Sequence, residues 1–136
     1  MSITEVVFPD TLVMYVPGDP NKAIPEQAKQ GFTCLESGIS DFQGRKFFGV
    51  VQGKEYRACV SIADVELESS LPYPTWTIPG GKYVRRKIID WPSHTEDIGV
   101  AFAQLYDRLD VDASRPGIEY YRSQRELFVM VPIQCP

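Results

Sequence analysis

The chain has 136 residues, of which 43% are hydrophobic and 24% are charged, a composition typical of a globular protein rather than a disordered one. Its formal net charge is −4 and its isoelectric point is about 5.0, so binding to a phosphate backbone is not expected as its main function. No run of about 18 apolar residues occurs, and no membrane-spanning segment is expected.

The N-terminal sequence and the cysteines indicate the compartment. MSITEVVFPD has neither a basic start nor a long apolar run, so it does not predict a signal peptide. Cys34, Cys59 and Cys135 are odd in number and lack metal-binding spacing, so no metal or other cofactor is expected. Cys34 and Cys59 fall in predicted helix or strand, where a free cysteine is usually a buried apolar filler. We expect a cytoplasmic protein in a reducing environment.

The first half of the chain predicts a strand, a helix and a hairpin. Residues 12–19 predict the strand, and residues 25–38 predict the helix, which Gly38 would end. The apolar stripe of this helix consists of Ala28, Phe32 and Leu35. Residues 46–62, KFFGVVQGKEYRACVSI, predict two strands joined by a tight turn.

The middle of the chain predicts a connection followed by strands. Residues 63–74, ADVELESSLPYP, are acidic and then proline-bearing, which favours a linker. Residues 75–78 predict a strand, and the PGGK sequence at 79–82 predicts a turn, because its spacing fits no nucleotide-binding fingerprint. The basic run KYVRRK at 82–87 divides its charges between two strand faces, which favours a solvated edge strand over a nucleic-acid site.

Residues 96–109 predict the clearest helix of the chain. Its apolar positions are Ile98, Ala101, Phe102, Leu105, Tyr106 and Leu109. Ser93 and Glu96 predict a capping box at its start. His94 is the only histidine, and we expect it to be exposed rather than to act as a catalytic group or a haem ligand.

A second hairpin is predicted over residues 117–133, GIEYYRSQRELFVMVPI. A two-residue turn at Ser123 and Gln124 would pair Glu119 with Phe128. That register places Glu119, Tyr121, Phe128 and Met130 on one face of the sheet. The opposite face would then carry Ile118, Tyr120, Leu127, Val129 and Val131, and would take the helix.

The two halves of the chain align with each other at an offset of 71 residues (117 − 46). The offset superimposes the two hairpins, the two helices and the strands that precede them, and places Phe48 where the second copy has Glu119. We therefore expect one domain over 1–136, with repeats at about 1–62 and 75–136 and a linker at 63–74. Each repeat would be a strand–helix–strand–strand module, too small to be stable alone.

Glu119 and the tryptophans leave alternatives open. Glu119 is either a solvated edge-strand acid or an acid at the floor of an aromatic pocket, where it would attract a cation. Its predicted neighbour Phe128 offers no ion pair. Trp76 and Trp91 lie at the ends of predicted elements, where large aromatics serve equally as lids on a core or as walls of a pocket.

The order of these motifs resembles the GyrI-like, AraC-type effector-binding domains. Gly80, Gly81 and Tyr83 match the small-residue turn and the tyrosine that open a strand in that family. Residues 96–109 match its helix, and Pro116, Glu119 and Tyr121 match its "P..E.Y" strand. Residues 126–133 match its final strand. The chain differs at Asp90, Trp91 and Pro92, where many members have a glycine before the helix.

The resemblance implies a SOUL-like α+β fold. It would be a tandem pseudo-twofold repeat of strand–helix–strand–strand modules, with an antiparallel sheet, two helices and a central cleft. It also implies a stand-alone binding protein for a hydrophobic, cationic small molecule, with Glu119 as the charge complement. The expected ligand-binding residues are Glu119, Tyr121, Trp91, Tyr83, Phe48, Phe128, Met130 and Trp76.

Two other functions remain open at this point. A few GyrI-like proteins resemble hydrolases of reactive xenobiotics, in which Glu119 would act as general acid or base with Tyr121 as a hydrogen-bond donor. A protein-interaction role, such as gyrase inhibition or partnership with a separate regulator, is the third possibility. We favour binding over catalysis and expect neither nucleic acid nor membrane as a direct partner; the sequence does not indicate the oligomeric state.

Overall fold

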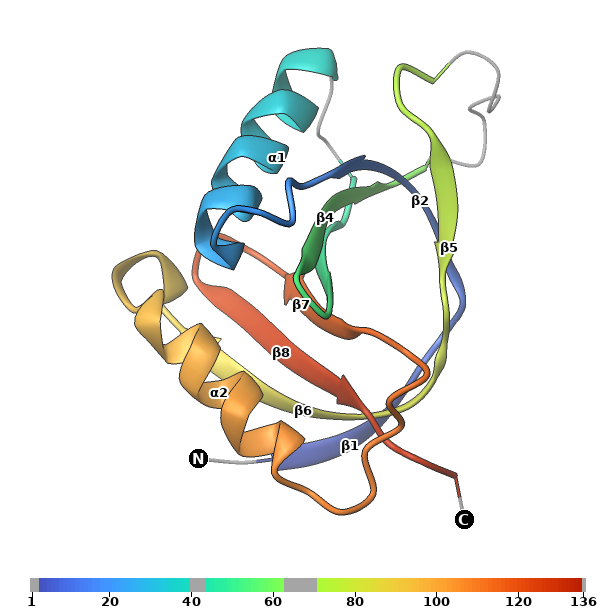
Figure 1. Ribbon diagram of the computed structural model, residues 1–136, viewed down its shortest axis with the longest axis vertical. Coiled ribbons are helices and arrows are strands. Elements are labelled where there is room, and N and C mark those ends of the chain that lie inside the picture. The colour runs from blue at the N-terminus through green and yellow to red at the C-terminus, as the bar shows by residue number, and fades with distance from the viewer. Residues whose placement is uncertain (1–2, 40–43, 63–70, 136) are drawn as a thin grey trace. The chain divides into compact units, whose positions relative to one another are not determined.

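The computed structural model of the protein describes residues 3–39, 44–62 and 71–135 (Figure 1). These residues form eight β-strands and two α-helices, an α+β fold as predicted. The chain divides into two compact units. The first unit is Thr11–Ile78, and the second unit is Met1–Asp10 together with Pro79–Pro136.

The first unit is a four-stranded antiparallel sheet with one helix. Its elements are β2 (Thr11–Pro17), α1 (Ile24–Gly38), β3 (Phe47–Gln52), β4 (Glu55–Ser61) and β5 (Thr75–Ile78). The strand order is β3-β4-β2-β5, and α1 packs against β4 and β2. Its helix-facing core consists of Met14, Leu35, Ile39, Tyr56, Ala58 and Val60.

Gln27 fastens the start of α1 to the β3–β4 hairpin. Its side chain is fully buried, and its amide nitrogen donates to the carbonyl oxygens of Lys22 (2.9 Å) and Lys54 (2.7 Å). Its amide oxygen accepts from the backbone N–H of Tyr56 at 2.9 Å. These bonds satisfy a buried polar side chain that would otherwise destabilise the unit.

The second unit repeats the arrangement. Its elements are β1 (Ile3–Phe8), β6 (Gly81–Ile89), the 3₁₀ helix η2 (Trp91–Ser93), α2 (Glu96–Tyr106), β7 (Gly117–Tyr121) and β8 (Glu126–Pro132). The strand order is β1-β6-β8-β7, all antiparallel, and α2 packs against β8 and β6. Its helix-facing core consists of Val84, Ile88, Ala101, Leu105, Leu127, Val129, Val131 and Ile133.

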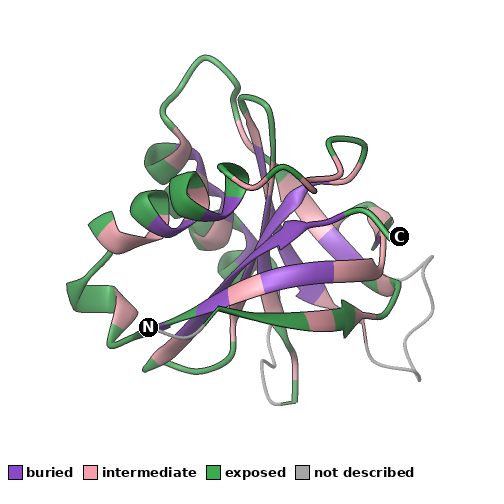
Figure 2. Cartoon of the chain, turned by 90° about the horizontal axis from the view of Figure 1, so that it is seen from below, coloured by how far each residue is buried: buried purple, intermediate pink, exposed green. Residues whose placement is uncertain are grey.

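The two units therefore share the predicted strand–helix–strand–strand order. In each, the most buried residues lie on the strands and on one stripe of the helix, while the remaining helix surface is exposed (Figure 2). The second unit takes its outer strand β1 from the N-terminal end of the chain, whereas the first unit is continuous and ends with its outer strand β5. Residues 63–70, most of the predicted linker, lie outside the described residues.

Arg115 links the backbone at the start of β6 to the backbone just after β8. Its guanidinium donates to the carbonyl oxygens of Gly80 (3.3 Å), Lys82 (3.1 Å) and Ile133 (2.8 Å). It also pairs with Asp112 at 3.0 Å. Hydrogen bonds from Ser114 and then from Arg115 lower the pKa of the Asp112 carboxyl to about 2. The turn predicted at 79–82 is confined to Pro79 and Gly80, because Gly81 and Lys82 already belong to β6.

Two local predictions are wrong. The basic run at 82–87 is not an edge strand, because it lies in β6 between β8 and β1, a strand the sequence pattern did not indicate. The capping box at Ser93 does not form, because the 3₁₀ helix over 91–93 precedes α2, whose N-cap is Thr95, with no side-chain cap bond.

The predicted register of the second hairpin is also wrong, by one residue. Glu119 pairs with Val129, and Tyr121 pairs with Leu127. The turn after Tyr121 is longer than two residues, since the backbone N–H groups of Arg122 and Ser123 both donate to the carbonyl of Glu126. A one-residue change of register exchanges the two faces of a strand. Glu119 and Tyr121 therefore lie on the side of the sheet that α2 covers, here called the α2 face.

The corrected register also changes the internal alignment. Phe48 pairs with Cys59, and Ile118 pairs with Met130, so Phe48 corresponds to Ile118. The residue that corresponds to Glu119 is Gly49, which pairs with Ala58 as Glu119 pairs with Val129. The offset is thus 70 residues before the turn (119 − 49) and 71 after it (129 − 58).

The cysteines differ from each other in burial. Cys59 is buried as predicted, whereas Cys34, predicted to be an apolar filler, is exposed on α1. Cys135 is also exposed.

No helix in the described part of the chain is long and apolar enough to cross a membrane.

Two helical glycines give opposite predictions for the same substitution. A methyl group at Gly31 would lie 2.9 Å from Cβ of Ala58, whereas one at Gly99 would meet nothing within 4 Å. We expect Gly99→Ala to raise the free energy of unfolding by about 0.5–1 kcal/mol through helix propensity. Gly31→Ala should lower it by about 1 kcal/mol, because overpacking outweighs that gain. Urea unfolding measures both; stabilisation by Gly31→Ala would contradict the close helix–strand approach.

The thiols should differ in reactivity. Burial raises the pKa of the Cys59 thiol to about 12, although nearby Arg57 opposes the shift. Because only the thiolate reacts, we expect a chromogenic disulfide reagent at about pH 8 to modify Cys34 and Cys135 in the folded protein. Cys59 should react only after unfolding. The double variant Cys34→Ser, Cys135→Ser is the control, and rapid reaction of its folded form would contradict this prediction.

Candidate ligand-binding site

Glu119 is a buried acid in the middle of β7. Glu119 is only 4% exposed, and it lies on the α2 face beside Val129. A carboxylate is rarely buried to this extent unless the fold supplies polar partners. The interpretation of Glu119 as a solvated edge acid is therefore wrong.

Tyr121 supplies one of the hydrogen bonds of Glu119. The two residues are two positions apart on β7 and so share the α2 face. The Tyr121 hydroxyl donates to Oε1 of Glu119 at 2.6 Å, a length typical of an O–H···O⁻ bond. The bond fixes the orientation of the tyrosine ring, which is partly exposed.

Trp91 extends this group toward solvent. Its ring meets that of Tyr121 edge to face, with centroids 5.0 Å apart and planes at 70°. Its indole N–H donates to the carbonyl of Ser123 at 2.9 Å, which ties η2 to the β7–β8 turn. The preceding residue, Asp90, has φ of 54°, a left-handed conformation that favours glycine.

Arg86 is a second charged group on the α2 face, and sequence reasoning missed it. It is 7% exposed, and its NH1 group donates to Oε1 of Gln104 on α2 at 2.8 Å. Arg86 pairs with Val129, which pairs on its other side with Glu119. These three residues form a line across the sheet, here called the charged row. The alternation within 82–87 would have indicated Arg86, had β6 been predicted as an inner strand.

Three other predicted residues lie on the opposite face of the same sheet. Tyr83 is fully buried there, and its hydroxyl donates to the carbonyl of Pro79 at 2.7 Å. Phe128 and Met130 occupy alternate positions on β8. The guanidinium of Arg85 lies 4.4 Å from the centre of the Phe128 ring. The structure thus separates these residues from Glu119 by the thickness of the sheet.

Phe48 and Trp76 belong to the first unit, on the side of its sheet away from α1. Phe48 is buried, whereas Trp76 is partly exposed and meets Tyr15 edge to face. The guanidinium of Arg57 lies over both rings, 4.6 Å from the centre of Tyr15 and 4.7 Å from that of Trp76. A ligand role for these two residues remains a prediction.

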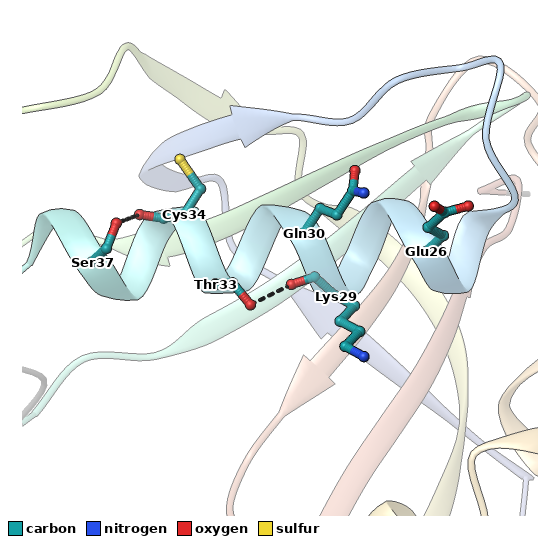
Figure 3. A pocket seen from close by; sticks show the side chains of 6 residues that line it. All are labelled: Glu26, Lys29, Gln30, Thr33, Cys34 and Ser37. Atoms are coloured by element: carbon teal, nitrogen blue, oxygen red, sulfur yellow. Dashed lines mark hydrogen bonds between the residues drawn. The ribbon is translucent and has the colours of Figure 1, made fainter.

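A pocket of about 510 Å³ lies along the exposed surface of α1 and contains none of the predicted residues. Its lining consists of Glu26, Lys29, Gln30, Thr33, Cys34 and Ser37 (Figure 3). Two of its hydroxyl groups bond to the helix itself: Thr33 donates to the carbonyl of Lys29 (2.8 Å) and Ser37 to that of Cys34 (2.7 Å). Because these groups are directed to their own backbone, we do not place the function here.

Metal binding gains no support from the described residues. They contain no group of three or more His, Cys, Asp or Glu side chains arranged to hold an ion. His94 is exposed, as predicted. The polar side chains described above at this site are the carboxylate of Glu119, the phenol of Tyr121, the indole of Trp91 and the guanidinium of Arg86.

Solved structures share the fold. An integron cassette protein from the mobile metagenome of Vibrio cholerae has a TM-score of 0.71 at 15% identity, covering 98% of this chain and 95% of that one. A candidate bacterial transcription regulation protein from Staphylococcus aureus gives 0.63 at 13%, covering 99% of each. A protein solved bound to tetraphenylphosphonium gives 0.61 at 14%, covering 98% and 94%. No protein-family model and no curated protein matches the chain.

The bond between Tyr121 and Glu119 can be tested by a double-mutant cycle. Tyr121→Phe keeps the ring but removes the donor, so we expect the free energy of unfolding to fall by about 1.5 kcal/mol. In the Glu119→Gln background the same change should cost about 0.5 kcal/mol, because the carboxylate is already gone. Denaturant unfolding of the four proteins gives the coupling, and additive effects would contradict a direct bond.

Proposed function

We propose that the chain is a small-molecule-binding protein of the GyrI-like effector-binding type. The ligand is hydrophobic and carries a positive charge, and it binds at Glu119, Tyr121 and Trp91. The observation that carries the proposal is the buried carboxylate of Glu119, bonded to the hydroxyl of a partly exposed Tyr121 at 2.6 Å. A carboxylate next to aromatic rings attracts a cation through charge and through the ring faces.

The first unit supports a functional role for the acid. Its corresponding position is Gly49, so a module of this kind folds without a carboxylate there. An acid that the fold does not need, and that costs free energy to bury, is better explained by binding than by stability.

The comparisons are compatible with this proposal. One protein of the same fold was solved with tetraphenylphosphonium bound, and another is a candidate transcription regulator. At 13–14% identity they support the fold, and the ligand class is inferred from the residues of this chain. A regulatory role would follow if ligand binding changed an interaction with a separate protein.

Tetraphenylphosphonium provides a direct test. We expect the wild-type protein to bind it, and Glu119→Gln to weaken binding about tenfold or more, because the charge complement is lost while the shape is kept. Isothermal titration calorimetry measures both. The matched control is Glu126→Gln: Glu126 is an acid of the same hairpin that pairs with Lys87 at 3.0 Å. Equal weakening by both substitutions would indicate only a general effect of net charge.

Hydrolysis is the second candidate, because the Tyr121–Glu119 bond also resembles an acid–base pair. Steady release of a nitrophenol from an activated ester, lost in Glu119→Gln although binding persists, would assign an enzyme instead. Absence of turnover together with tight binding would assign a binding protein.

A further inference from the structure

Three side chains of the first unit, Arg57, Tyr15 and Trp76, form a cluster that the proposed function does not use. They come from the adjacent strands β4, β2 and β5 (Figure 1) and lie on the face of the sheet opposite to α1. The guanidinium of Arg57 lies 4.6 Å from the centre of the Tyr15 ring and 4.7 Å from that of Trp76. The planes of the two rings meet at 69°, so the rings form a corner that the guanidinium occupies, here called the arginine corner.

The arginine corner holds the guanidinium in place without using all of its donors. Nε of Arg57 pairs with Oε1 of Glu55 at 3.3 Å, and within the described part of the chain this is the hydrogen bond that the guanidinium makes. The side chain of Arg57 is 30% exposed, which leaves its two terminal nitrogens open to an acceptor from solution. A guanidinium stacked on aromatic rings is a pre-organised fork for the two oxygens of a carboxylate.

The second unit makes the corresponding contact with ring and cation exchanged. The strand pairings place Arg57 at the position of Phe128, and Tyr15 at the position of Arg85. In the second unit the guanidinium of Arg85 lies 4.4 Å from the centre of the Phe128 ring, and Phe128 is buried. One cation over one ring is therefore sufficient for this position of the module.

Trp76 is the part of the arginine corner that the second unit lacks. It pairs with Val13, and the corresponding pair in the second unit is Val6 with Tyr83, so a valine takes the place of the tryptophan. Trp76 also stays partly exposed, and so does the other ring of the corner. Tryptophan, tyrosine and arginine are the residue types that dominate binding energies most often, so an additional exposed indole beside a fixed guanidinium indicates a binding surface.

We propose that the arginine corner binds an aromatic carboxylate. The carboxylate accepts hydrogen bonds from the two terminal nitrogens of Arg57, and the aryl group lies on the exposed part of Trp76. The proposal does not depend on the proposed function, because it concerns the first unit and a ligand of the opposite charge. The formal net charge of −4 disfavours general binding of anions, so a preference for the carboxylate has to come from Arg57.

A matched pair of probes tests this through the indole signals of the protein. Naphthoate and naphthamide share one ring system and differ in charge. The chain has two tryptophans, so a proton–nitrogen correlation spectrum contains two indole N–H signals, which Trp91→Phe assigns. We expect naphthoate to shift the Trp76 signal with a dissociation constant of about 1 mM or below, and naphthamide to bind at least about tenfold more weakly. The Trp91 signal should not move.

Substitutions then locate the preference. Arg57→Lys keeps the charge but removes the planar fork, so it should weaken naphthoate binding about tenfold. The control is Arg85→Lys, the same change at the guanidinium that lies over Phe128 in the second unit, and it should leave naphthoate binding unchanged. Circular dichroism establishes that each variant is folded.

Several results would overturn the proposal. They are a Trp76 signal that naphthoate at about 10 mM does not shift, equal affinities for the two probes, and equal weakening by the two arginine substitutions. A shift caused by tetramethylammonium but not by naphthoate would also overturn it, because the corner would then take a cation in place of Arg57. Glu119→Gln separates the two proposals, since it should weaken tetraphenylphosphonium binding and leave naphthoate binding unchanged.

Discussion

The length of the turn between β7 and β8 determines which side of the sheet carries Glu119. With a two-residue turn, the acid would share a face with Phe128; with the longer turn it shares the α2 face with Val129. The bonds from Arg122 and Ser123 to the carbonyl of Glu126 close this longer turn, and the indole of Trp91 bonds to Ser123 within it. The site and its register thus depend on the same few residues.

A buried acid and a buried base on one sheet face are costly, and the fold offsets the cost locally. Tyr121 donates to Glu119, and Gln104 accepts from Arg86, so each charged group has a polar neighbour from the same unit. An ion taken from water loses several kcal/mol of solvation, so hydrogen bonds within the unit reduce the cost of burying it.

The modules were predictable from sequence, because helical periodicity and strand alternation are local signals. The helix predicted over 96–109 begins where α2 begins but ends three residues later than α2 does, and the repeat indicated both hairpins. The strand β1 was not predicted, because residues 3–8 have no clear alternation and form a strand only by pairing with β6. The error of one residue at the β7–β8 turn followed from assuming the shortest turn, and it exchanged the neighbours of Glu119.

Glu119, Tyr121 and Trp91 were predicted to act together, and the structure does bring them together. Arg86 was not, because a basic run in an assumed edge strand is ordinarily solvated. Its burial depends on which strand lies outside β6, and that pairing joins residues about eighty positions apart (Ile3 with Arg86, 86 − 3 = 83). Local patterns do not report such a pairing, whereas the burial of Arg86 in the structure does.

The edge-to-face contact between Trp91 and Tyr121 also gives the protein an optical reporter of its own. The chain has two tryptophans, and Trp76 lies in the first unit beside Tyr15 and Arg57. Replacing Trp76 by phenylalanine would leave an indole whose ring touches a partner of Glu119 and whose N–H is fixed to the hairpin. The emission of Trp91 would then respond to whatever occupies the neighbourhood of the acid, without an added label.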